Sequence, residues 1–217
     1  MLTHRFRQLV LTLAIIINII AGSAIAFAGD LEVTVLDQNQ ENIKNAVVML
    51  YANEGQQINF TPPYPEVMAQ RDVAFAPHVL AIYIGSEVAF PNQDETRHHV
   101  YSFSEARVLE LRLYEGGAVR TVDFPNAGVV VLGCNIHDSM LGYIYVSDTP
   151  IFLKSNEVGK AHFKDLPEGE YRMRIWHPRL HGNMEDMEKT IVVSAEGTQI
   201  ISHDLRLKRE RRSRSAY

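Results

Sequence analysis

Cysteine is almost absent from this sequence, because Cys134 is the single one among 217 residues. One cysteine excludes an intramolecular disulfide and any zinc module built from several cysteines. The chain also lacks HExxH and CxxC motifs, a Gly-rich phosphate loop and a serine in a nucleophile elbow. These absences argue against hydrolytic and nucleotide-dependent chemistry, and we do not expect an enzyme.

Basic residues are scarce in the body of the chain. Residues 29–205 hold 13 Lys and Arg against 25 Asp and Glu, a balance of −12, while residues 206–217 hold six bases and one acid. Because phosphate groups need a basic surface, the acidic body argues against nucleic acid as a partner. With 46 % hydrophobic and 22 % charged residues, the composition is that of an ordinary globular protein.

The first 28 residues have the pattern of a secretory signal peptide. His4, Arg5 and Arg7 precede an apolar stretch, and Ala26-Phe27-Ala28 supplies the small-x-small pattern before a cleavage site after Ala28. The alternative is an uncleaved anchor, since residues 9–28 are just long enough to span a bilayer. We expect an exported, periplasmic protein with no spanning segment after the signal.

Short strand patterns dominate the rest of the chain, with Gly- and Pro-rich turns between them and no sustained helical period. This spacing predicts an all-β fold of the β-sandwich class. We expect residues 31–36 and 46–51 to form a hairpin-like pair. The predicted divisions are a first domain at 29–148, a small β unit at 149–207 and a disordered basic tail at 208–217. The small unit is too short to be stable alone, so it packs on the first domain or borrows strands from residues 31–51.

The candidate site lies in two segments that are far apart in the sequence. Cys134, His137 and Met140 follow a strand in a C-x2-H-x2-M spacing, and His98 stands where an upstream loop enters a strand. A thiolate and two imidazoles with a weak axial thioether form the ligand set of an electron-transfer copper site. We therefore expect one mononuclear type 1 copper held by His98, Cys134, His137 and Met140.

Other histidines fit other roles better. Successive strand residues face opposite sides, so only one of His98 and His99 should point at the metal. With His98 in that role, His99 is a neighbouring or surface group, or a proton-linked modulator near neutral pH. His177 and His181 follow Trp176 in a segment that we interpret as a surface turn with an aromatic anchor; the alternative is a second metal site. The basic tail is a solvated end, or else a weak docking arm for an acidic partner or anionic lipid.

The two segments resemble the motifs of cupredoxins of the plastocyanin and amicyanin type. Asn92, His98 and Val100 match the first motif. Cys134, His137 and Met140 match the second, between Gly128 and Gly142, with an amicyanin-like spacer before the methionine. The resemblance covers about residues 75–148 and implies a Greek-key β-sandwich. The layout of the whole chain also resembles periplasmic copper proteins labelled as methylamine-utilisation proteins.

Two residues depart from the family pattern. His99 stands where these proteins commonly have an asparagine that ties the ligand loops together, and Asp138 stands where amicyanin has proline. An acidic residue beside His137 suggests a different docking partner. The predicted function is single-electron transfer between transient protein redox partners. The alternatives are a copper-binding or delivery protein without redox cycling, and a metal-free β-sandwich binding module.

Overall fold

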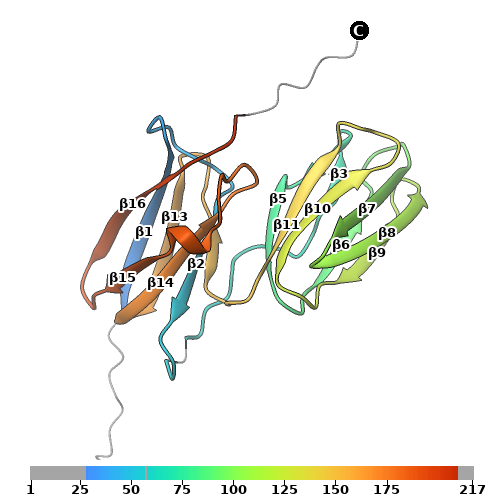
Figure 1. The fold of residues 1–217 in the computed structure, drawn as a ribbon. Coiled ribbons are helices and arrows are strands. Elements are labelled where there is room, and N and C mark those ends of the chain that lie inside the picture. The colour runs from blue at the N-terminus through green and yellow to red at the C-terminus, as the bar shows by residue number, and fades with distance from the viewer. Residues whose placement is uncertain (1–27, 57, 210–217) are drawn as a thin grey trace, which may run out of the picture.

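A computed structural model describes residues 28–56 and 58–209 of the chain (Figure 1). These residues form sixteen strands and one short 3-10 helix, η1 (Glu185–Met187), so the predicted all-β fold class is confirmed. No helix in the described ranges is long and apolar enough to cross a membrane. The predicted signal at 1–28 lies outside the described residues except for Ala28, and so does the tail beyond Arg209.

Two sheets that contain both ends of the described chain form one β unit, called here the second unit (Figure 1). One sheet has the order β13-β1-β16 and the other the order β12-β2-β14-β15. The strands are β1 (Ala28–Asp37), β2 (Val47–Ala52), β12 (Phe152–Lys154), β13 (Lys160–Pro167), β14 (Gly169–Trp176), β15 (Lys189–Val193) and β16 (Thr198–Leu205).

Strands β1 and β2 belong to this second unit, as in the alternative by which the small unit borrows strands from residues 31–51, and not to a first domain that begins at residue 29. The predicted hairpin is wrong as well, since β1 and β2 lie in different sheets and only a single bridge, Leu36 to Asn42, joins the two segments. Leu31, Val33 and Val35 alternate with less buried residues, so β1 has one apolar face that packs against the apolar β2 in a shared core. Borrowing these strands supplies the core that a unit of residues 149–207 lacks.

The remaining strands form the first unit, a β-sandwich with its own apolar core. A five-stranded sheet has the order β5-β11-β10-β7-β8, and the pairs β6-β9 and β3-β4 complete the unit. The strands are β3 (Ala69–Arg71), β4 (Ala74–Ala76), β5 (Val79–Tyr83), β6 (Glu87–Pro91), β7 (His98–Ser104), β8 (Arg107–Tyr114), β9 (Val119–Asp123), β10 (Gly128–Cys134) and β11 (Leu141–Ser147).

Aromatic side chains join the two units. The ring of Trp176, at the end of β14, lies 6.1 Å from the ring of Tyr143 and 5.1 Å from that of Tyr145, both on β11. The Lys154 ammonium of the second unit donates a 2.7 Å hydrogen bond to the Val79 carbonyl of the first. Trp176 is therefore a buried aromatic anchor, and the units meet on it.

Candidate metal centre

Strand pairing brings the two predicted segments together at one end of the first unit. Cys134, the last residue of β10, pairs with Val100 on β7, and β7 begins at His98. The residues after Cys134 then form a loop that carries His137 and returns at Leu141 as β11. Antiparallel pairing of β10 with β7 therefore places a cysteine beside a histidine 36 residues earlier in the chain.

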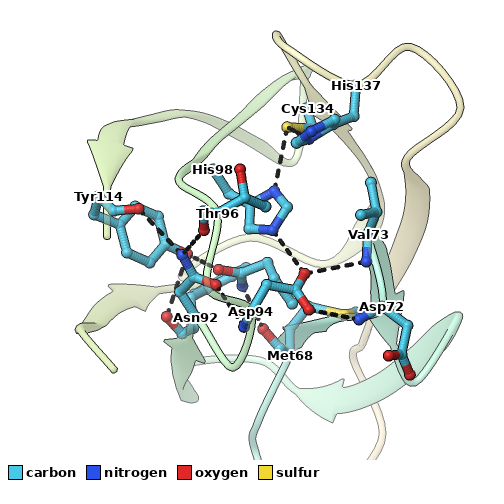
Figure 2. Close-up of polar contacts among 12 residues, drawn as sticks. Met68, Asp72, Val73, Asn92, Asp94, Thr96, His98, Tyr114, Cys134 and His137 are labelled. Atoms are coloured by element: carbon cyan, nitrogen blue, oxygen red, sulfur yellow. Dashed lines mark hydrogen bonds and ion pairs between the residues drawn. The ribbon is translucent and has the colours of Figure 1, made fainter. Parts of the chain in front are cut away.

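The thiol and two imidazoles converge on one small volume (Figure 2). The Cys134 Sγ atom lies 3.7 Å from His98 Nδ1 and 3.6 Å from His137 Nδ1. One ligand atom from each of the three residues lies within 4.8 Å of the others, and this is the one such group among the described residues. The structure thus brings together His98, Cys134 and His137, as predicted.

These spacings fit a single metal ion between the three atoms. With a thiolate at about 2.3 Å and an imidazole at about 2.0 Å, ligand angles of about 110 to 120° place sulfur and nitrogen about 3.5 to 3.7 Å apart. The two observed sulfur–nitrogen separations, 3.7 Å and 3.6 Å, fall within or close to this interval. The donor set of one soft thiolate and two imidazoles suits a thiophilic transition metal.

The tautomer of His98 is set by Asp94. His98 Nε2 donates a 2.8 Å hydrogen bond to Asp94 Oδ2, so Nδ1 keeps its lone pair and faces Cys134 (Figure 2). A carboxylate behind a metal-binding imidazole fixes its ring and increases its basicity. Burial by itself raises the pKa of Asp94, but the hydrogen bond from His98 and those from two backbone amides outweigh it and hold this pKa below its ordinary value.

Those backbone amides belong to the turn between β3 and β4. Asp72 N and Val73 N donate to the Asp94 carboxylate at 2.7 Å and 3.1 Å. Both turn residues have positive φ, 56° and 55°, which closes a tight hairpin and turns the two amides toward one acceptor. Asp94 therefore ties His98 to a hairpin that is otherwise remote from it in sequence.

Asn92 organises the loop that leads to His98. Its Nδ2 donates to the carbonyls of Thr96 and Tyr114 at 2.8 Å and 3.1 Å, and its Oδ1 accepts a 3.0 Å bond from Asp94 N. The Asn92 side chain is buried, so each of these bonds replaces one that water would otherwise supply. Beneath it, the Tyr114 hydroxyl bonds to the buried Gln70 side chain, and burial raises the pKa of that hydroxyl.

The three candidate ligands differ in their exposure to solvent. The His98 side chain is fully buried and Cys134 is buried, whereas His137 is partly exposed. Ile136 and Leu141 expose apolar side chains on either side of His137 in sequence, and Asp138 is exposed next to it. Metal held here is closed to water on the His98 side and approachable along the His137 edge.

Met140 is buried in the core of the first unit, and its backbone amide donates a 2.9 Å bond to the His137 carbonyl. Its axial role stays a prediction.

The other histidines lie outside the candidate ligand group. His99 Nε2 lies 3.1 Å from Glu110 Oε1. The Asn135 amide donates to the His99 carbonyl, so the main chain of His99 links the two ligand loops. His177 accepts a bond from the Arg179 amide, and neither it nor His181 belongs to the metal-binding group of the described residues.

Sequence reasoning missed Asp94, Gln70 and Tyr114. Asp94 had a usable signal, since it stands four residues before His98 in a short polar loop. Gln70 and Tyr114 had none, because they contact each other across 44 residues of sequence and Tyr114 further contacts Phe90 and Asn92 from other segments.

No family model and no curated protein matches the chain. The solved structures to which it is similar are amicyanin and other cupredoxins, the group that the motifs resemble. A reduced amicyanin variant is 17 % identical with a TM-score of 0.35, covering 48 % of this chain and 99 % of its own. A purple cupredoxin from Nitrosopumilus maritimus is 20 % identical with a TM-score of 0.34, covering 37 % and 98 %. A copper-containing nitrite reductase from Thermus scotoductus is 23 % identical with a TM-score of 0.38, covering 46 % of this chain and 26 % of its own.

Proposed function

We propose that the protein is an exported copper protein that carries single electrons between transient protein partners. The observation that carries this proposal is the convergence of Cys134 Sγ with two imidazole nitrogens at 3.6 Å and 3.7 Å. When bound, copper supplies a one-electron couple between Cu(II) and Cu(I) at such a His2Cys set. The protein side chains hold the donor geometry, exclude water and provide the surface for a partner.

The chain keeps the donor geometry fixed in both oxidation states. Asp94 holds the proton of His98 on Nε2, and the buried Asn92 fixes the loop on which His98 stands. A site whose ligands are held by surrounding hydrogen bonds reorganises little when its charge changes, which favours rapid transfer. Burial of His98 and Cys134 excludes water from one side of the ion.

Electrons enter and leave at the His137 edge in this proposal, because His137 is the candidate ligand with solvent exposure. Ile136 and Leu141 give a partner apolar surface next to it. Met140 would supply a fourth donor beside His98, Cys134 and His137, and four protein donors would leave no open position for a substrate, which favours an electron carrier over an enzyme. The acidic body disfavours nucleic acid as a partner.

Export rests on the pattern of residues 1–28 and on the state of the thiol. Outside the cytoplasm an exposed single thiol tends to oxidise or to pair with another chain. Cys134 is buried and free, which protects it in such a compartment. We therefore propose a periplasmic location and weak docking of partners through the basic tail.

The test is optical and EPR spectroscopy of the purified protein with one equivalent of Cu(II). We expect an intense thiolate-to-Cu(II) band, a reversible potential and a copper-linked gain in the free energy of unfolding of about 2.7 kcal/mol at a hundredfold excess over Kd. Cys134→Ser is expected to remove both the band and the gain. Asn135→Ser, an exposed neighbour, is the matched control that keeps them.

Three results would contradict the proposal in different ways. A colourless complex that releases its metal readily favours copper delivery. Unchanged spectra and melting temperature on adding copper favour a metal-free binding module. A Cys134→Ser variant that keeps the visible band shows that the metal binds elsewhere.

A further inference from the structure

A cleft of about 730 Å³ lies where the two units meet, apart from the candidate ligands themselves. Three segments of the second unit line it: residues 42–45 after β1, residues 177–179 after β14, and residues 208–209 after β16. The first unit contributes His78, Leu141 and Tyr143. This volume is within the range of small-molecule sites, about 300 to 1,000 Å³, and such sites often lie between domains.

The charged side chains of this cleft are all basic, and we call it the basic cleft. Lys44, Arg179, Lys208 and Arg209 line it, and no Asp or Glu is among its described lining residues. Lys44 forms an exposed ion pair with Glu157 at 2.9 Å. Residues 29–205 carry a net charge of −12, so a cleft lined only by basic charged residues differs from the acidic body around it. A concave surface lined by charge of one sign attracts ligands of the opposite sign.

Two of these cations stand on backbone that is held in place. The Lys208 amide donates a 2.8 Å bond to the Arg179 carbonyl, and Arg179 Nε donates a 3.0 Å bond to the Lys208 carbonyl. Next to them the His181 amide donates to the Arg206 carbonyl at 2.8 Å, and Leu180 and Leu207 form a β-bridge. The positions of Arg179 and Lys208 are therefore set by pairing between the two segments and not by loose surface loops.

His177 lies beside these cations and is half-buried. Burial is the largest cause that lowers its pKa, and together with the positive charge of Arg179 and the neighbouring His78 it brings this pKa to about 4. The ring is consequently neutral at pH 7, and its Nδ1 accepts a 3.2 Å bond from the Arg179 amide. The positive charge that lines the cleft thus comes from Lys and Arg side chains, with Glu157 paired to Lys44 and Asp37 within electrostatic reach of Arg179.

We propose that the basic cleft binds a small organic anion, one with an apolar body and an oxyanion head group. Ile43, Leu141, Tyr143 and Pro178 provide apolar contact area for the body, and the lining cations Lys44, Arg179, Lys208 and Arg209 provide positive charge for the head group. Apolar contact area with a few placed charges is the usual composition of an organic-ligand site, and charge-assisted hydrogen bonds from Lys and Arg hold carboxylate or phosphate oxygens. The proposal assigns a role to the second unit and does not depend on copper binding.

The basic cleft also adjoins the candidate metal centre through the chain. Leu141 lines the cleft and directly follows Met140, and the next lining residue on β11, Tyr143, donates its amide to the His78 carbonyl at 2.9 Å. A bound anion therefore contacts the strand that begins where the 134–140 loop ends. If copper binds as proposed, its visible band reports occupancy of the cleft as a second readout.

The test is isothermal titration calorimetry of the full chain at low ionic strength, with metal-free and copper-loaded samples run separately. The probes are 2-naphthoate and 1-naphthyl phosphate, and the uncharged control is 2-naphthamide. We expect saturable one-to-one binding of at least one anion and binding of the amide that is at least about tenfold weaker. Comparison of the two anions shows whether the head group is a carboxylate or a phosphate. Because the metal-free sample is measured by itself, failure to bind copper leaves this result readable.

A double variant locates the site. Lys208→Gln with Arg209→Gln is expected to weaken anion binding about tenfold, since both side chains are exposed and their removal spares the backbone pairing. Arg112→Gln with Lys164→Gln, exposed cations on β8 and β13, is the charge-matched control and is expected to leave the affinity unchanged. Amide shifts in two-dimensional NMR spectra should concentrate at residues 42–45, 141–143 and 177–179.

Each contrary result overturns the proposal. No saturable binding of either anion, equal binding of the amide, an equal loss in both double variants, or NMR shifts centred outside the basic cleft would show that the cleft is not an anion site.

Discussion

The two loops that bring donor atoms to the candidate metal centre are held by different means. In the 92–98 loop, the buried Asn92 side chain makes three hydrogen bonds and Asp94 ties His98 to the β3–β4 turn. The 134–140 loop is held mainly by main-chain bonds, from Asn135 to His99 and from Met140 to His137. Its central residues, from Asn135 to Ser139, are exposed or partly exposed. One loop sets the geometry of the site, and the other presents it to solvent.

In the proposed electron-transfer function, this difference gives the two loops separate roles. The 92–98 loop would hold the His98 imidazole at a fixed distance from the Cys134 sulfur while the charge of the metal changes. The 134–140 loop places the His137 imidazole at the surface, where a proposed partner would approach. Changes in the 92–98 loop should therefore alter metal binding and stability. Changes in the 134–140 loop should alter the access of solutes and partners to the metal centre.

The largest expected contrast comes from removing each imidazole and supplying it from solution. In His137→Gly, added imidazole reaches the vacated place because His137 is partly exposed, and the visible copper band should return. In His98→Gly, the side chain removed is 0 % exposed, so imidazole in solution has no path and the band should stay absent. Absorption titrations with imidazole measure both.

The control is the Cys134→Ser variant, in which imidazole should restore nothing because the thiolate is missing. Rescue of both glycine variants to the same extent would contradict the contrast between a closed and an open loop.

The next effect is on stability. Asn92→Ala removes two donors and one acceptor from a buried site and leaves the Thr96 and Tyr114 carbonyls without these bonds. Each unsatisfied buried group costs about 1 to 3 kcal/mol, so we expect a loss of about 2 to 4 kcal/mol in the free energy of unfolding. Asn135→Ala in the other loop, where the side chain is exposed, should change it by less than about 0.5 kcal/mol. Urea denaturation of the metal-free variants measures both; equal losses would contradict the comparison.

A smaller effect is expected on metal affinity. Asp94→Asn keeps the shape of the side chain but replaces the charged acceptor of the His98 Nε2 proton with a neutral amide. Partners behind a metal ligand contribute about 10- to 100-fold to affinity, so we expect a decrease within that range. Asp138→Asn, which removes the acid next to His137, is the matched control and should leave affinity unchanged while altering docking to charged partners. Competition with a copper chelator measures the affinities.

The grouping of His98, Cys134 and His137 was predictable from the sequence because its signal is local. Cys134 and His137 are three residues apart on one strand and loop, and His98 lies where a polar loop meets a strand. The all-β class was equally accessible, because alternation in β1 and in other strands reports one buried face. The sequence alone could not show that the two segments lie close together, because this depends on the pairing of Cys134 with Val100.

The features that were missed depend on pairing between distant strands. β1 and β2 are close in sequence and were expected to pair, but each finds its partners more than 100 residues away, β1 with β13 and β16, and β2 with β12 and β14. The Gln70 side chain on β3 accepts a hydrogen bond from the Tyr114 hydroxyl on β8, and the two strands are far apart in sequence. Alternation shows which face is buried and not which strand lies beside it.

The contrast between a buried and an exposed histidine extends to the second unit and gives the smallest of the predicted effects. His203 on β16 is buried, and its Nδ1 has no hydrogen-bond partner within the described structure. Burial first, and then Lys189, lower the pKa of His203 to about 4, against a weaker opposing effect of Asp204. Between the ordinary value of about 6.5 and this lowered value, the unfolded chain binds a proton that the folded chain does not. Stability contributed by the neutral ring is therefore complete above pH 6.5 and is lost as the pH falls toward 4.

His203→Phe keeps a ring in the core and removes the titrating group. Between pH 7 and pH 5 the parent should lose on the order of 1 to 2 kcal/mol more of its free energy of unfolding than this variant. His181→Phe makes the same substitution at an exposed histidine of the same unit and should leave the pH dependence of the parent intact. Urea denaturation at pH 7, 6 and 5 separates the three proteins. If His203→Phe and His181→Phe lose stability in parallel with the parent, the buried ring is not the group whose protonation destabilises the second unit. The half-buried His177, which has a similarly lowered pKa, then becomes the group to substitute next.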